Sequence, residues 1–152
     1  MGQGVTFRIY LPASTLGTED DVEDTVSAPT GHGETLLLVE DNTRLREAGQ
    51  NLLTALGYRV LTAANGLEAL AIYQTEEHIA LIVTDLVMPE MGGKALVQAL
   101  HDNDPGQKVL VMTGYTTEES TESLRAAGFL EVIRKPFEAD SLAWVVRRAL
   151  DA

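Results

Sequence analysis

The 152-residue sequence contains no cysteine, which excludes disulfide bonds, thiol chemistry and thiolate metal sites. It also has no apolar run near the roughly 18 residues of a membrane-spanning helix. Its first residues lack the basic start and long apolar stretch of a secretion signal. We therefore expect a cytoplasmic protein that makes no direct contact with a membrane.

Basic residues are scarce: 11 Lys and Arg stand against 23 Asp and Glu, for a net charge of −12. This balance argues against nucleic-acid binding, which needs clustered positive charge. Residues 13–34 hold six acids and no Lys or Arg, mixed with Ser, Thr and Gly. This composition predicts a flexible acidic linker. The remaining residues, 35–152, have the length of one domain.

From residue 35 onward, short segments rich in Val, Ile and Leu alternate with amphipathic helical patterns. Five strands are predicted, at 36–39, 59–62, 79–84, 109–112 and 130–133. The helical stripes are Leu45, Ala48, Leu52 and Leu56; Leu67, Leu70 and Ala71; Leu96 and Leu100; and Leu142, Val145, Val146 and Ala149, with the weakest stripe over 118–127. Gly57 and Gly128 stand where helices are expected to end.

Strands that are apolar on both faces, each followed by a helix, are typical of a parallel sheet covered on both sides. We therefore predict an α/β fold, a (βα)₅ doubly wound sheet with the flavodoxin-like strand order 2-1-3-4-5. In such sheets the ligand site lies beyond the carboxyl ends of the strands. The strand ends are consequently the place to look for chemistry.

Polar residues follow four of the five predicted strands: the pair Glu40-Asp41, then Asp85, Thr113 and Lys135. Three carboxylates at one edge of a sheet repel one another unless a cation neutralises them. Mg²⁺ prefers such oxygen ligands. We expect Asp41 and Asp85 to bind Mg²⁺ directly and Glu40 to contact it through water.

Asp85 ends the central strand and is the candidate nucleophile, because a carboxylate can attack phosphorus to give an acyl phosphate. Phosphoryl transfer depends on positioning and on stabilising charge. Lys135 and Mg²⁺ would supply positive charge, and the Thr113 hydroxyl a hydrogen bond. Taken singly, each residue could instead cap a helix, form a turn or be solvated. Their order along successive strand ends is what favours a site.

This order resembles the receiver domain of response regulators over residues 35–152. The matching motifs are Glu40-Asp41, Asp85-Leu-Val-Met-Pro-Glu-Met-Gly-Gly, Met112-Thr-Gly and Lys135-Pro-Phe. The resemblance implies that Asp85 is the phosphoacceptor, with Glu40 and Asp41 as the acid pair and the Val87 backbone carbonyl as a further metal ligand. It also implies that Thr113 is the switch hydroxyl, that Lys135 binds the phosphoryl group, and that the Lys135–Pro136 peptide is cis.

The implied function is a two-component phosphorelay: the receiver takes a phosphoryl group from the phospho-histidine domain of a sensor kinase. It would catalyse its own phosphorylation and slow dephosphorylation, and a histidine phosphotransfer protein is a possible further partner. Residues 1–12 resemble the last strand of the ATP-binding domain of sensor histidine kinases. We therefore expect a receiver from a hybrid sensor histidine kinase, without the kinase catalytic domain.

Two positions depart from the family pattern. Val132 stands where many receivers have an aromatic switch residue, and Val87 where many have a polar side chain that influences hydrolysis of the acyl phosphate. Three alternatives remain: a pseudo-receiver that is a binding module and is not phosphorylated, a stand-alone receiver that ferries phosphate, and a metal-dependent phosphatase. The phosphatase is disfavoured because its chemistry needs a general acid at the position of Val87.

Overall fold

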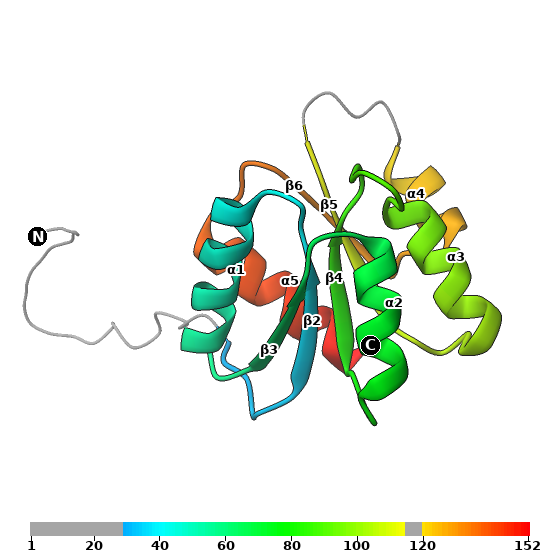
Figure 1. Ribbon diagram of the computed structural model, residues 1–152. Coiled ribbons are helices and arrows are strands. Elements are labelled where there is room, and N and C mark those ends of the chain that lie inside the picture. The colour runs from blue at the N-terminus through cyan, green and yellow to red at the C-terminus, as the bar shows by residue number, and fades with distance from the viewer. Residues whose placement is uncertain (1–28, 115–119) are drawn as a thin grey trace, which may run out of the picture.

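A computed structural model describes residues 29–114 and 120–152. Within these residues five parallel strands form one sheet, in the order β3-β2-β4-β5-β6 (Figure 1). The strands are β2 (Thr35–Val39), β3 (Arg59–Ala63), β4 (Leu81–Asp85), β5 (Val109–Thr113) and β6 (Glu131–Arg134). Numbered from residue 35, this is the predicted order 2-1-3-4-5. The strand expected near the N-terminus lies outside the described residues.

Five helices connect and cover these strands: α1 (Thr43–Ala55), α2 (Gly66–Thr75), α3 (Gly93–Asn103), α4 (Thr121–Ala127) and α5 (Ala139–Asp151). Helices α1 and α5 cover one face of the sheet, and α2, α3 and α4 cover the other (Figure 1). The predicted α/β doubly wound fold is therefore confirmed. None of the helices in the described ranges is long and apolar enough to cross a membrane.

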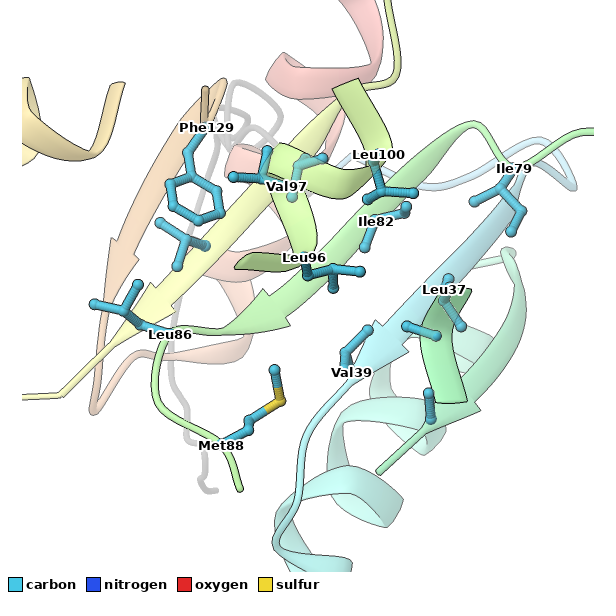
Figure 2. Close-up of a cluster of buried hydrophobic side chains, with 14 of the residues drawn as sticks. Leu37, Val39, Ile79, Ile82, Leu86, Met88, Leu96, Val97, Leu100 and Phe129 are labelled. Atoms are coloured by element: carbon cyan, nitrogen blue, oxygen red, sulfur yellow. The ribbon is translucent and has the colours of Figure 1, made fainter. Parts of the chain in front are cut away.

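Each strand contributes side chains to two cores, one on each side of the sheet. Figure 2 shows part of the core beneath α3, where Leu37 and Val39 of β2 and Ile82 of β4 face Leu96 and Leu100 of α3. The alternate strand residues pack on the opposite face, against α1 and α5; they include Leu36, Leu38, Leu81 and Val83. Burial on both faces explains why the strands read as continuous apolar runs instead of alternating ones.

The helical stripes were predicted less well than the strands. In α1 the fully buried residue is Leu53, whereas Leu45 is 50% exposed. In α2 the buried apolar side chain is Ala69, and Leu67 is 52% exposed. The stripe of α1 was wrong at Leu45 and Ala48, which line an open groove between α1 and α5, whereas Leu52 and Leu56 pack against the core as predicted.

Helices α1 and α4 end as predicted, at glycines with left-handed backbone. Gly57, which follows the last residues of α1, has a φ of 101°, and Gly128, which caps α4, has a φ of 119°. Residues that carry a side chain rarely adopt this backbone conformation, so glycine is the residue best suited to both turns. Two predicted strands begin early: Ile79 is buried but precedes β4, and Leu130 precedes β6.

Residues 30–34, which we name the N-terminal strap, pack against the domain although they fall within the predicted linker. The Gly33 N–H donates to the Gly57 carbonyl at 2.9 Å, and the Gly31 N–H donates to the Leu56 carbonyl. A Cβ atom on Gly31 would lie only 2.5 Å from the ring of Tyr58, so this approach requires glycine. The part of the predicted linker before residue 29 lies outside the described residues.

A partly exposed ion pair joins the strap to α5. Arg147 Nη2 lies 2.9 Å from Glu34 Oε2, and Arg147 Nη1 donates to the Thr30 carbonyl at 3.4 Å. Burial alone would raise the pKa of Glu34, but backbone N–H groups and Arg147 outweigh it and hold the pKa below the usual 4.5. The ionised carboxylate therefore stabilises the folded chain.

We predict that Glu34→Gln lowers the free energy of unfolding by about 0.5–1 kcal/mol at neutral pH, the range for a partly exposed ion pair. Because the pKa of Glu34 is depressed by folding, its contribution is present above the unfolded value near 4.5 and is lost as the pH falls through the lower folded value. Urea denaturation across pH 3–7 tests both points. Glu47→Gln, at an exposed position on α1, is the matched control; equal effects of the two variants would contradict the prediction.

Candidate functional site

The carboxyl edge of the sheet brings together four of the predicted site residues. Glu40 and Asp41 follow β2, and Asp85 ends the neighbouring strand β4. One carboxylate oxygen from each of these three residues lies within 4.8 Å of the others. Lys135 joins them from the end of β6, with its Nζ 3.0 Å from Glu40 Oε1 and 3.3 Å from Asp85 Oδ2.

Glu40 is enclosed, and its polar groups are bonded within the chain. Its side chain is 4% exposed. Oε1 accepts from Lys135, Oε2 accepts from the Asn42 N–H at 3.2 Å, and the Glu40 N–H donates to the Ala63 carbonyl. Burial raises the pKa of Glu40, and the Asp85 carboxylate adds to this rise against the opposing bonds from Lys135 and Asn42. Glu40 is therefore an anchor of the cluster more than an open ligand.

Lys135 is the cation of the cluster. Burial alone would lower its pKa, but the carboxylates of Glu40 and Asp85 outweigh that effect and raise the pKa above the usual 10.5. The ammonium group therefore stays charged. The backbone N–H of Lys135 donates to the Thr113 carbonyl at 2.6 Å. The Lys135–Pro136 peptide is cis, as predicted.

Asp85 and Asp41 are the accessible carboxylates. The Asp85 side chain is 16% exposed, and its Oδ1 accepts from the Leu86 N–H at 2.9 Å. The start of α3 packs against the backbone of Asp85 so closely that a Cβ on Gly93 would lie 2.7 Å from the Asp85 carbonyl oxygen. Asp41 is exposed. The carboxylate of Asp85 is thus fixed by the Leu86 N–H, next to the start of α3, and remains partly accessible to solvent.

The donor set suits a hard divalent cation. Mg²⁺ binds one or two protein carboxylates while keeping several waters, and two open carboxylates beside a third, enclosed one match that preference. Lys135 already offsets part of the negative charge of the cluster. The acidic cluster is therefore a fit for Mg²⁺, with Asp41 and Asp85 as the accessible donors.

The structure places the other two predicted residues differently. Thr113 ends β5 and is fully buried, and its hydroxyl accepts a hydrogen bond of 3.4 Å from Arg134, which is not a member of the acidic cluster. Val87 lies two residues beyond Asp85, and its side chain is 73% exposed. Its backbone carbonyl as a metal ligand stays a prediction. Of the three histidines, His32 and His78 are exposed, whereas His101 is half-buried and contacts the Gln107 carbonyl.

Two residues beside the cluster were missed by sequence reasoning. Asn42 caps α1, accepting from the Leu45 N–H at 3.1 Å, while its own N–H binds Glu40. Arg46, in α1, donates from Nη1 to the Glu40 carbonyl at 2.8 Å. A signal was present for each: Asn is a favoured N-cap, and Arg near the start of a helix opposes the helix dipole.

Comparison with known proteins gives the family. The model of the response regulator receiver domain matches residues 36–147. The chain belongs to this family. It is 33% identical over 162 aligned residues to sensor kinase CckA of Brucella abortus, covering 99% of this chain and 17% of that protein. It is 30% identical to sporulation initiation phosphotransferase F of Bacillus subtilis, covering 77% of this chain and 94% of the relative.

Solved receiver structures agree with the fold. A CheY-like receiver domain protein from Methanospirillum hungatei superposes with a TM-score of 0.72 at 30% identity, covering 78% of this chain and 94% of the other. The chain spans well under half of some relatives: 17% of CckA and 42% of a response regulator receiver protein from Anaeromyxobacter. The predicted receiver family and flavodoxin-like strand order are confirmed, and the receiver belongs to phosphorelay signalling.

We predict that Mg²⁺ stabilises the folded receiver through this cluster. At a free concentration about 100 times the dissociation constant, binding to the folded state alone adds roughly 2.7 kcal/mol. Asp41→Asn and Asp85→Asn should each lose most of this gain, measured as the rise in melting temperature on adding Mg²⁺. Asp102→Asn, at an exposed position on α3, is the control and should keep it. An equal rise in all four proteins would contradict binding at the cluster.

Proposed function

We propose that this receiver accepts a phosphoryl group on Asp85 from the phospho-histidine domain of a sensor kinase, in the cytoplasm. The observation that carries the proposal is the position of the Asp85 carboxylate, 3.3 Å from the Lys135 ammonium and beside Glu40 and Asp41. A lone carboxylate at a strand end would not need such neighbours. Together they provide a nucleophile and the positive charge that a transferred phosphoryl group requires.

In the transfer, a carboxylate oxygen of Asp85 attacks phosphorus while the phosphorus–nitrogen bond of the donor histidine breaks. The electron pair leaves with the imidazole, which takes up a proton, and an acyl phosphate remains on Asp85. The Leu86 N–H orients the carboxylate through Oδ1. Lys135, held by Glu40, faces the incoming phosphoryl oxygens and offsets their charge. Asp41 and Asp85, with the Val87 carbonyl, would hold Mg²⁺, which would supply further positive charge for the transfer.

Thr113 is proposed to report the phosphorylated state. Its neighbour Met112 pairs with Asp85 across the two central strands, so the hydroxyl lies one residue beyond the phosphoacceptor. Exchanging the hydrogen bond from Arg134 for one to a phosphoryl oxygen would break this contact with β6, so phosphorylation would be felt at that strand. Val132, on β6, has no hydroxyl or ring to follow that movement, so Thr113 would act without an aromatic partner.

A docking surface for the donor lies beside the site. The groove between α1 and α5, with a volume of about 530 Å³, runs from the exposed Leu45 to Lys135 and Phe137. Its lining is almost entirely apolar. An apolar surface next to the nucleophile suits a protein donor that must bring its phospho-histidine within reach of Asp85. A histidine phosphotransfer protein is the further partner that we propose for the same surface.

A hybrid sensor histidine kinase is the proposed source of the chain. The receiver family match begins at residue 36, but the similarity to CckA covers 99% of the chain and so includes the residues before it. This supports the resemblance of residues 1–12 to the end of a kinase ATP-binding domain. The predicted linker, residues 13–34, would then join that domain to the receiver, with residues 30–34 packed against the receiver.

We predict one phosphoryl group per chain after incubation with acetyl phosphate and Mg²⁺, measured by intact mass. Asp85→Asn should gain none, because the amide is not a nucleophile toward phosphorus, and chelation of Mg²⁺ should abolish the gain in the native chain. Asp102→Asn is again the control. A native chain that stays unmodified with both acetyl phosphate and a phosphorylated kinase domain would favour the pseudo-receiver.

We also predict slow hydrolysis of the acyl phosphate, because the exposed Val87 side chain cannot orient an attacking water by hydrogen bonding. Val87→Asn should hydrolyse about tenfold faster, a modest share of what a positioned polar group contributes. Val87→Leu, which remains apolar, is the matched control. The decay of the phosphorylated mass after removal of acetyl phosphate gives the rate. A half-life of seconds in the native chain would contradict the idea.

A further inference from the structure

Arg46 braces the peptide group that joins the two predicted acid-pair residues. Its Nη1 donates to the Glu40 carbonyl at 2.8 Å, and Arg46 is half-buried. The other groups of Glu40 are bonded to Ala63, Asn42 and Lys135. The Arg46 bond therefore completes the fixation of Glu40 and sets the orientation of the peptide that leads into Asp41.

The position of Arg46 in the helix is unfavourable on local grounds. Its N–H donates to the Asn42 carbonyl, which places it in the first full turn of α1. Positive charge there opposes the helix dipole, and α1 has no acidic residue in its first turn to compensate. Side chains of helical residues point back toward the helix N-terminus, which is what allows Arg46 to reach the preceding loop. The hydrogen bond to the Glu40 carbonyl is the compensating interaction that the structure shows for Arg46.

We propose that Arg46 is a positioning residue for the metal site: by holding the Glu40–Asp41 peptide, it aims the Asp41 carboxylate at the cation that Asp41 shares with Asp85. This inference rests on the proposed function. It gives Arg46 a role in Mg²⁺ affinity and none in contact with the phosphoryl group. Groups that orient metal ligands typically change metal affinity by 10–100-fold when removed.

Charge and geometry make opposite predictions for this residue. If Arg46 acted only through its positive charge, removing it would strengthen cation binding, because less positive charge would remain near the carboxylates. If it acts as a brace, removing it weakens binding, because Asp41 loses its fixed direction. The sign of the change in affinity therefore decides between the two.

The test is calorimetric titration of the 152-residue chain with MgCl₂, comparing the native chain with Arg46→Met, Arg46→Lys and Arg44→Met. Arg44 is exposed on the same turn of α1, so its variant removes a nearby charge and leaves the brace. We expect binding about tenfold weaker in Arg46→Met, within about twofold of native in Arg44→Met because exposed charges are screened, and intermediate in Arg46→Lys, which retains one donor. If Arg46→Met does not fold, Arg46→Gln, too short to reach the carbonyl, replaces it.

A second readout separates positioning from catalysis. At saturating Mg²⁺, Arg46→Met should approach the native initial rate of phosphorylation by acetyl phosphate, while the Mg²⁺ concentration for half the maximal rate rises about tenfold. Native or tighter Mg²⁺ binding in Arg46→Met overturns the inference, as does a Lys variant as weak as the Met variant. A native chain that binds no Mg²⁺ overturns the proposed metal site as well, so the two failures are distinguishable.

Discussion

The site depends on holding three carboxylates of like charge at one edge of a sheet. Lys135 makes this arrangement tolerable, since its ammonium group lies within 3.3 Å of both Glu40 and Asp85. A parallel sheet is what delivers these groups to one place, because all its strands end at the same edge. Its two apolar cores in turn fix the strands, so the geometry of the charged edge rests on the packing of uncharged side chains below it.

The three carboxylates differ in their burial and in their hydrogen-bond partners, and these differences correspond to different proposed roles. Glu40 is enclosed and fully bonded within the chain, so it organises Lys135. Asp85 is backed by the Leu86 N–H and by the start of α3 but open toward solvent. Asp41 is the most exposed of the three. Burial and hydrogen bonding thus distinguish three equivalent chemical groups, in line with the proposed roles of Glu40 as anchor, Asp85 as nucleophile and Asp41 as ligand.

The strands and their polar ends could be predicted from the sequence because both signals are local. An apolar run such as residues 36–39, followed directly by Glu40-Asp41, fixes a buried strand and the edge where its end lies. The pair of Glu34 and Arg147 could not be predicted in this way, since 113 positions separate its members. The stripe of α1 was wrong at Leu45 for a related reason: Leu45 resembles a core residue by spacing, and only the shape of the groove between the helices shows that it is exposed.

The N-terminal strap sets where a preceding domain would be attached. It meets the domain just before β2 begins, whereas Asp85 lies at the opposite, carboxyl end of the sheet. A domain attached at the strap would leave Asp85, the proposed phosphoacceptor, accessible to a phosphoryl donor. Helix α5 spans the distance between the acidic cluster and the strap. It starts a few residues after Lys135, and near its end Arg147 forms the ion pair with Glu34 of the strap. A displacement of α5 along its axis would therefore move the N-terminal strap. In this way one helix mechanically connects the acidic cluster to the point where a preceding domain would be attached.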